Sequence, residues 1–158
     1  ISRISAARPK IADYPFTTLT PSLGVVTPGS GEPFVVADIP GLIEGAQHGA
    51  GLGDKFLRHV ERTRILLHLI DAAQIDPDAP LAAYTAINRE LSGYQAELVQ
   101  KPQLVVLNKI DLPEGQAGAK RFMADFTEHP VTAISAATGK GVSQLVDRLN
   151  ELINDYPG

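Results

Sequence analysis

Residues 104–111 read Leu-Val-Val-Leu-Asn-Lys-Ile-Asp, so an apolar run is followed at once by a polar one. An uninterrupted apolar run after Pro102 predicts a strand that is buried on both faces, which is typical of a parallel sheet. Open sheets of this kind bind ligands at the carboxyl ends of their strands. A carboxylate has two acceptor oxygens and no donor, so Asp111 suits a ligand with two adjacent N–H donors, such as the edge of guanine.

The two polar residues before Asp111 suit the same ligand. The Asn108 amide can tie its loop to neighbouring segments, and the aliphatic stem of Lys109 can cover the face of a base. A tetrad of this kind also arises by chance in surface loops, so other segments have to decide between the two interpretations.

Two further strand ends carry polar or small residues. Residues 38–41 read Asp-Ile-Pro-Gly after the strand-like run 34–37, and residues 135–137 read Ser-Ala-Ala after the run 131–134. The order Asp-x-x-Gly, Asn-Lys-x-Asp, Ser-Ala-x resembles the GTPase superfamily. Together the three loops favour a guanine-nucleotide site over chance.

Composition sets the broad class. The 158 residues are 44% hydrophobic and 20% charged, which predicts a single globular domain over residues 1–158. No apolar run approaches the roughly 18 residues of a membrane span. Cysteine is absent, which excludes disulfides and thiolate metal sites and fits a cytoplasmic protein. We also expect the protein to be a monomer. A net charge of −4 does not indicate nucleic-acid binding by the chain as a whole.

Strand-like and helix-like segments alternate along the chain. A Gly/Pro-rich turn at 28–33 predicts a hairpin, and residues 10–21 have no clean period and are expected to be a loop. The expected strands are 23–26, 34–37, 65–70, 104–107 and 131–134. The expected helices are 1–7, 54–62, 80–99, 116–126 and 142–153. This alternation predicts an α/β fold of three layers, with a mostly parallel sheet flanked by helices on both faces.

Longer stretches of the loops make the resemblance more specific than the superfamily. Residues 14–21 read Tyr-Pro-Phe-Thr-Thr-Leu-Thr-Pro, residues 38–45 read Asp-Ile-Pro-Gly-Leu-Ile-Glu-Gly, and Gly51-Leu-Gly53 precedes Phe-Leu-Arg-His-Val-Glu-Arg-Thr at 56–63. These stretches closely resemble the Obg family of bacterial GTPases over essentially the whole chain. The resemblance implies a P-loop NTPase-like G domain that hydrolyses GTP to GDP and phosphate. It also implies a role in assembly of the large ribosomal subunit.

The resemblance implies roles for individual residues. Thr18, in preference to Thr17, would supply a hydroxyl to Mg²⁺, and Asp38 would hold the ion through a water. The backbone N–H groups of residues 135–137 would face guanine O6. The implied nucleotide-binding residues are Asp38, Ile39, Pro40, Gly41, Asn108, Lys109, Asp111, Ser135, Ala136 and Ala137. Each of these could instead be an ordinary turn residue.

Position 42 is Leu, where many GTPases place a Gln that orients the attacking water. No catalytic residue can therefore be assigned, and we expect slow intrinsic hydrolysis. Leu42 could equally be a core residue.

One expected motif is missing from the 158 residues. A phosphate-binding loop reads Gly-x-x-x-x-Gly-Lys-[Ser/Thr]. The nearest candidate is Gly139-Lys140, which has Ile134 and Gly141 where the motif needs Gly and a hydroxyl residue. We expect a G domain truncated at its N-terminus, without its first strand and phosphate loop, that binds nucleotide poorly by itself. The alternative is a non-hydrolysing binding or scaffold module for a ribosomal or protein partner.

Overall fold

The computed structural model describes residues 10–11, 22–37, 63–94 and 96–156. The chain consists of two compact units, each of which has its own network of internal contacts. One unit comprises Ile1–Thr63 and Ile87–Gln100, and the other comprises Arg64–Ala86 and Lys101–Gly158. That residues 1–158 act as a single domain stays a prediction.

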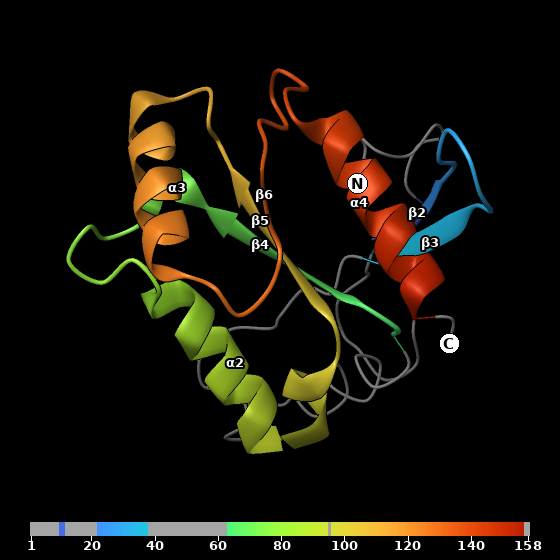
Figure 1. Cartoon of the computed structure of the whole chain (residues 1–158), viewed down its shortest axis with the longest axis horizontal. Coiled ribbons are helices and arrows are strands. Elements are labelled where there is room, and N and C mark those ends of the chain that lie inside the picture. Colours follow the sequence, from blue (N-terminus) through green and yellow to red (C-terminus); the bar gives the residue numbers. More distant parts are fainter. Residues whose placement is uncertain (1–9, 12–21, 38–62, 95, 157–158) are drawn as a thin grey trace. The chain divides into compact units, whose positions relative to one another are not determined.

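The first unit contains a three-stranded antiparallel sheet. Strands β2 (Ser22–Val26) and β3 (Phe34–Ala37) pair as a hairpin, labelled in Figure 1, with Val26 opposite Phe34. This hairpin was expected from the turn at 28–33. The expected loop over 10–21 is wrong at Lys10–Ile11, which form the short strand β1 beside β2. A two-residue strand is defined by hydrogen bonds to its partner, and it is too short to show a period in the sequence.

The second unit contains a parallel sheet in the order β4-β5-β6 (Figure 1). Its strands are β4 (Leu66–Asp71), β5 (Gln103–Asn108) and β6 (Val131–Ala133). The central strand β5 is buried from residue 103 to residue 107, which includes the whole of the apolar run 104–107 that predicted a buried strand. The register places Asp71 beside Asn108, so the carboxyl ends of β4 and β5 are level.

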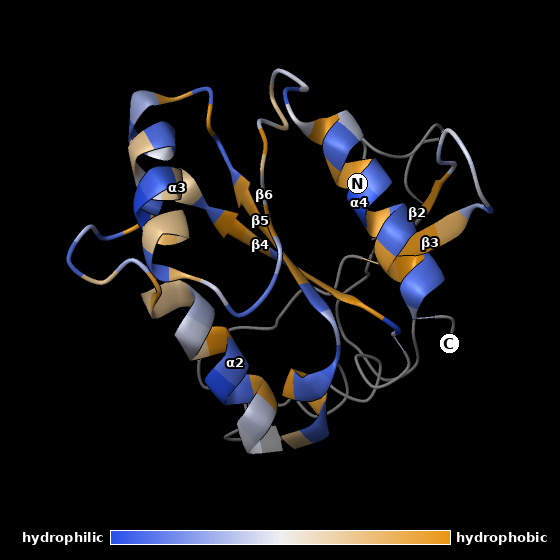
Figure 2. Cartoon of the chain, viewed as in Figure 1, coloured by the Kyte–Doolittle hydropathy of each residue, from blue (hydrophilic) through white to orange (hydrophobic). Residues whose placement is uncertain are grey.

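Two helices of this unit lie on opposite sides of its sheet, α3 (Pro113–Asp125) and α4 (Val142–Asp155) (Figure 1). Alternate β5 residues Val105 and Leu107 share a core with Phe122 of α3. The apolar stripe of α4 is buried at every third or fourth position, at Val142, Leu145, Leu149 and Leu152. Figure 2 shows strands that are mainly hydrophobic beside helices that carry both polar and apolar residues. The predicted α/β architecture of a sheet between helices is confirmed.

Two helices differ from the expected ones by more than two residues at one end. α3 begins at Pro113, three residues earlier than expected, because a proline at the first helical position has no N–H that needs a partner. The expected helix 80–99 is two elements, α2 (Ala82–Tyr94) and the 3₁₀ helix η3 (Ala96–Gln100). Gly93 weakens the end of α2, since glycine has low helix propensity. Leu98 is nevertheless buried, as its spacing predicted.

The expected helices 1–7 and 54–62 lie outside the described residues. None of the helices in the described ranges has the length and apolarity that crossing a bilayer requires.

Candidate functional site

The loops that follow β4, β5 and β6 meet at one edge of the parallel sheet. The N–H of Ile134 donates to the carbonyl of Leu107 at 2.8 Å, and the N–H of Ile110 donates to the carbonyl of Ile134 at 3.2 Å. These bonds join the loop after β5 to the loop after β6. Polar residues that are far apart in the sequence therefore gather at this edge.

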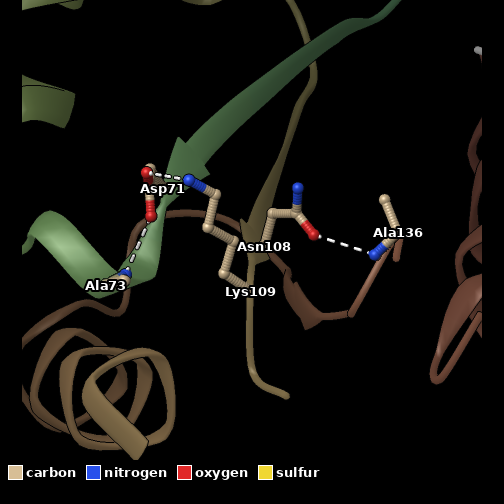
Figure 3. Close-up of polar contacts among 5 residues, drawn as sticks. All are labelled: Asp71, Ala73, Asn108, Lys109 and Ala136. Carbon is tan, nitrogen blue, oxygen red and sulfur yellow. Dashed lines mark hydrogen bonds and ion pairs between the residues drawn. The ribbon is translucent and has the colours of Figure 1, made fainter. Parts of the chain in front are cut away.

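Asn108 closes the junction between the two loops. Its Oδ1 accepts the backbone N–H of Ala136 at 2.9 Å, as the dashed line in Figure 3 shows. An amide oxygen that accepts a backbone N–H fixes both the side chain and the loop it contacts. The structure thus contains the tie that an Asn at this position suggested.

Asp111 is oriented by a buried serine. Ser135 is fully buried, and its Oγ donates to Asp111 Oδ1 at 2.9 Å. The same Oγ accepts the backbone N–H of Thr138 at 3.1 Å. The Thr138 N–H uses a lone pair of the Ser135 hydroxyl oxygen, so the O–H group remains available to donate to the Asp111 carboxylate. Asp111 itself is exposed, so its carboxylate can accept donors from a ligand.

Lys109 makes an ion pair across the edge. Its Nζ lies 2.7 Å from Oδ2 of Asp71, and Oδ1 of Asp71 accepts the N–H of Ala73 at 3.0 Å (Figure 3). The hydrogen bond from Lys109 lowers the pKa of the Asp71 carboxyl, and the Ala73 N–H acts in the same direction against partial desolvation. Asp71 also begins the 3₁₀ helix η2 (Ala72–Gln74) as its N-terminal cap. Both carboxylate oxygens are therefore engaged.

Helix α3 packs directly against these loops. A side chain at Gly115 would overlap the carbonyl oxygen of Lys109, and one at Gly118 would overlap the carbonyl oxygen of Ala72. Gln116 adds a hydrogen bond from its Nε2 to the carbonyl of Ile110 at 3.0 Å. Glycine at both positions lets the helix backbone approach the two strand ends closely.

Five of the predicted site residues come together here: Asn108, Lys109, Asp111, Ser135 and Ala136. Ala137 follows in the same turn. Two of the N–H groups expected to face guanine O6 have internal partners. The N–H of Ser135 donates to the carbonyl of Lys140 at 2.8 Å, and that of Ala136 donates to Asn108. A role for Ala136 toward guanine O6 stays a prediction and requires this bond to be exchanged or shared.

The other predicted residues fall in the ranges that are not described. These are Thr17, Thr18, Asp38, Ile39, Pro40, Gly41 and Leu42. Sequence reasoning also missed Asp71 as a member of the site. The available signal was an acidic residue at the end of a strand-like run, the position that the other polar loops share.

Histidine plays a packing role in this unit. His68 lies within β4, where burial lowers its pKa from 6.5 to about 4, and its ring stacks on Tyr84 with centroids 5.5 Å apart. The Tyr84 hydroxyl donates to Glu128 at 3.2 Å, and burial raises the pKa of Tyr84 to about 12. Within the described ranges, no three His, Asp or Glu side chains gather as a metal site would require.

A parallel sheet between helices, with polar loops at the carboxyl ends of its strands, defines the class of α/β nucleotide-binding domains. Residues 1–109 match the family model described as a 50S ribosome-binding GTPase. The GTPase Obg of Desulforapulum autotrophicum is 58% identical over 156 residues, which are 99% of this chain and 45% of that protein. The GTPase Obg of Desulfatibacillum aliphaticivorans is 57% identical over 94% of this chain and 44% of that protein.

The chain therefore belongs to the Obg GTPases within this family. It spans less than half the length of these two relatives.

Solved structures agree on the fold. The G domain of the T. maritima FeoB iron transporter superposes with a TM-score of 0.70 at 16% identity, over 96% of this chain and 87% of that one. The cytosolic domain of L. pneumophila FeoB gives 0.68 at 16% identity, over 96% of this chain and 61% of that one. At this identity the likeness speaks for architecture alone, and it confirms the expected G-domain fold.

Proposed function

We propose that this chain is the guanine-nucleotide-binding switch domain of a protein that hydrolyses GTP to GDP and phosphate. The observation that carries the proposal is the exposed Asp111 carboxylate, oriented by buried Ser135 at the edge where Asn108 joins two loops. Membership of the Obg GTPases supports the same assignment.

Asp111 would select guanine through its acceptor oxygens. Ser135 occupies one lone pair of Oδ1, and the carboxylate keeps further acceptor positions on both oxygens for the two adjacent N–H donors of guanine. Adenine presents a ring acceptor beside its amino donor, so one carboxylate oxygen would face a lone pair. Asn108, Lys109 and residues 135–137 would complete the base site.

The phosphate-responsive part of the switch would lie in segments beyond the described ranges. The Thr18 hydroxyl and the Asp38 carboxylate would hold Mg²⁺, and both are the oxygen ligands that this ion prefers. When bound, the ion supplies positive charge that neutralises the phosphates. Gly41, with Ile39 and Pro40 beside it, would contact the γ-phosphate. Loss of that phosphate would release both segments, as in other nucleotide switches.

Intrinsic hydrolysis would be slow. Leu42 has no polar atom in its side chain with which to orient an attacking water. We therefore assign no catalytic residue within these 158 positions.

The proposed partner is the large ribosomal subunit, whose assembly the protein would serve in the cytoplasm as a monomer. The description of the matching family model, a 50S ribosome-binding GTPase, supports this proposal. The alternative is a scaffold module that binds the same partner without hydrolysis. It is favoured by the lack of a Gly-x-x-x-x-Gly-Lys-[Ser/Thr] motif in the 158 residues.

Isothermal titration of the full-length protein with GDP, GTP, ADP and ATP, in the presence of Mg²⁺, tests the proposal. We expect guanine nucleotides to bind at least about 100-fold more tightly than adenine nucleotides, because mismatched partners leave polar groups unpaired. Residues 1–158 titrated in parallel should bind weakly, because the sequence contains no phosphate-loop motif. Equal affinity of the full-length protein for GDP and ADP would refute the guanine assignment and favour the scaffold alternative.

A further inference from the structure

We propose that Asp71 is a positioning residue for base binding, because it holds the Lys109 side chain across the edge of the sheet where the base would lie. This inference rests on the proposed function and adds a residue to its site. Figure 3 shows the Lys109 stem extending from the loop after β5 to the carboxylate at the end of β4.

The backbone of Lys109 has an uncommon conformation. Its φ is 76°, and Lys109 is the one residue other than glycine with a positive φ in the described ranges. This left-handed conformation is uncommon for residues with a Cβ. It fixes the direction in which the side chain leaves the loop. Gly115 allows helix α3 to pack against the Lys109 carbonyl, which holds the backbone in place.

The Asp71 carboxylate that binds Lys109 is itself held in place. Oδ1 of Asp71 accepts the N–H of Ala73, which sets the orientation of the carboxylate and leaves Oδ2 for Lys109. Asp71 and Asn108 are paired in register between β4 and β5. The two ends of the ion pair are therefore joined by the hydrogen-bonded strands themselves.

The ion pair between Lys109 and Asp71 would lower the entropic cost of binding a ligand. A lysine side chain has several freely rotating bonds, and ordering it on binding costs entropy. Here the 2.7 Å contact holds the stem extended before any ligand arrives. The Lys109 and Asp71 side chains remain 47% and 29% exposed, so the stem is accessible to a flat ring. Preorganisation of this kind strengthens binding because less ordering remains to be done.

Lys109 and Asp111 would therefore have different roles in binding the base. The aliphatic stem can pack on the face of any purine, whereas Asp111 reads the edge that distinguishes guanine. Asp71 should therefore change the affinity for purine nucleotides and leave the choice among them unchanged.

The test uses the full-length protein and isothermal titration with GDP and inosine diphosphate, which lacks the amino group at position 2. Asp71→Asn removes the charge and keeps the oxygen that caps Ala73. We expect about three- to fivefold weaker binding of both nucleotides, the range for a partly exposed ion pair. The ratio of the two affinities should not change. Asp71→Ser, which can also cap Ala73, provides a second variant of the same kind.

A double-mutant cycle separates positioning from a general structural effect. In a Lys109→Met background, which keeps an aliphatic stem and removes the ammonium, Asp71→Asn should cause no further loss. Glu151→Gln is the matched control, because it breaks a different exposed ion pair, that between Arg148 and Glu151 on α4. This control should bind both nucleotides as the wild type does.

Three results would overturn the inference while leaving the proposed function intact, provided that the wild type binds GDP. They are unchanged affinity in both Asp71 variants, an undiminished loss in the Lys109→Met background, and a changed ratio between GDP and inosine diphosphate. A wild-type protein that does not prefer GDP over ADP contradicts the proposed function itself and, with it, this inference.

Discussion

Asp111 and Ser135 show how one buried hydroxyl can prepare an exposed carboxylate. Ser135 has no contact with solvent, and both capacities of its hydroxyl are used, one toward Asp111 and one from Thr138. A buried polar group that is fully paired holds a single orientation. The Asp111 carboxylate is therefore positioned before a ligand binds, although it lies on an exposed loop.

Asp111→Asn in the full-length protein should exchange guanine preference for xanthine preference. The amide presents one acceptor and one donor, and xanthine carries a carbonyl where guanine carries its amino group. Hydrogen bonds to charged groups are worth about 1.5–3 kcal/mol, so GDP affinity should fall about 10- to 100-fold. Titration with GDP and xanthosine diphosphate measures the exchange. Asp147→Asn, an exposed change of the same kind on α4, is the control.

At the scale of elements, α3 is positioned by two glycines on one face. Gly115 meets the Lys109 carbonyl and Gly118 meets the Ala72 carbonyl, so this helix contacts the ends of both β4 and β5. Packing imposes no such requirement at Gly29, where a Cβ would meet nothing within 4 Å. Close packing therefore requires glycine at positions 115 and 118, whereas there is room for a side chain at position 29.

Gly115→Ala should destabilise the fold and Gly29→Ala should not. The added methyl group at position 115 would overlap backbone, so α3 or the Lys109 loop must shift, at a cost of about 1–3 kcal/mol. Urea unfolding followed by circular dichroism measures the difference between the two variants. GDP affinity should also fall for Gly115→Ala, because the loop that moves carries Lys109. Equal stability of the two variants would show that α3 does not depend on this close approach.

The sequence predicted those elements whose signals are local. The apolar run at 104–107 predicted a buried parallel strand, and the spacing of Val142, Leu145 and Leu149 predicted α4. The break between α2 and η3 and the pairing of Lys10–Ile11 were missed, because both depend on hydrogen bonds and not on the period of apolar residues. In the site, the tie from Asn108 to its neighbouring loop was anticipated. The contact between Asp71 and Lys109 was not, since it joins residues of two strands whose register the sequence does not state.

At the scale of the whole molecule, a half-buried titratable ring couples the stability of the chain to pH. His68 has a folded pKa of about 4, against 6.5 for an ordinary histidine, because burial disfavours the charged form. Between these two values the unfolded chain binds the proton and the folded chain does not. The contribution of His68 to stability is therefore complete above about pH 6.5 and is lost as the pH falls toward 4.

His68→Phe should flatten this part of the pH dependence. Phenylalanine keeps a ring against Tyr84 and cannot take up a proton. The wild type should lose up to about 3 kcal/mol more than the variant between pH 7 and pH 4, from the size of the pKa shift. Urea unfolding of both proteins at half-unit pH steps gives the comparison. Parallel curves for the two proteins would exclude His68 as the source.

The register of the parallel sheet also has a kinetic consequence. Val105 and Val131, which pair across β5 and β6, are closer together in the sequence than Leu66 and Gln103, which pair across β4 and β5. Closing the shorter loop costs less chain entropy, so β5, α3 and β6 should associate before β4 joins them. The loops that carry Asn108, Asp111 and Ser135 would then assemble early during folding. Asp71 would reach Lys109 only in a later step, when the last strand docks.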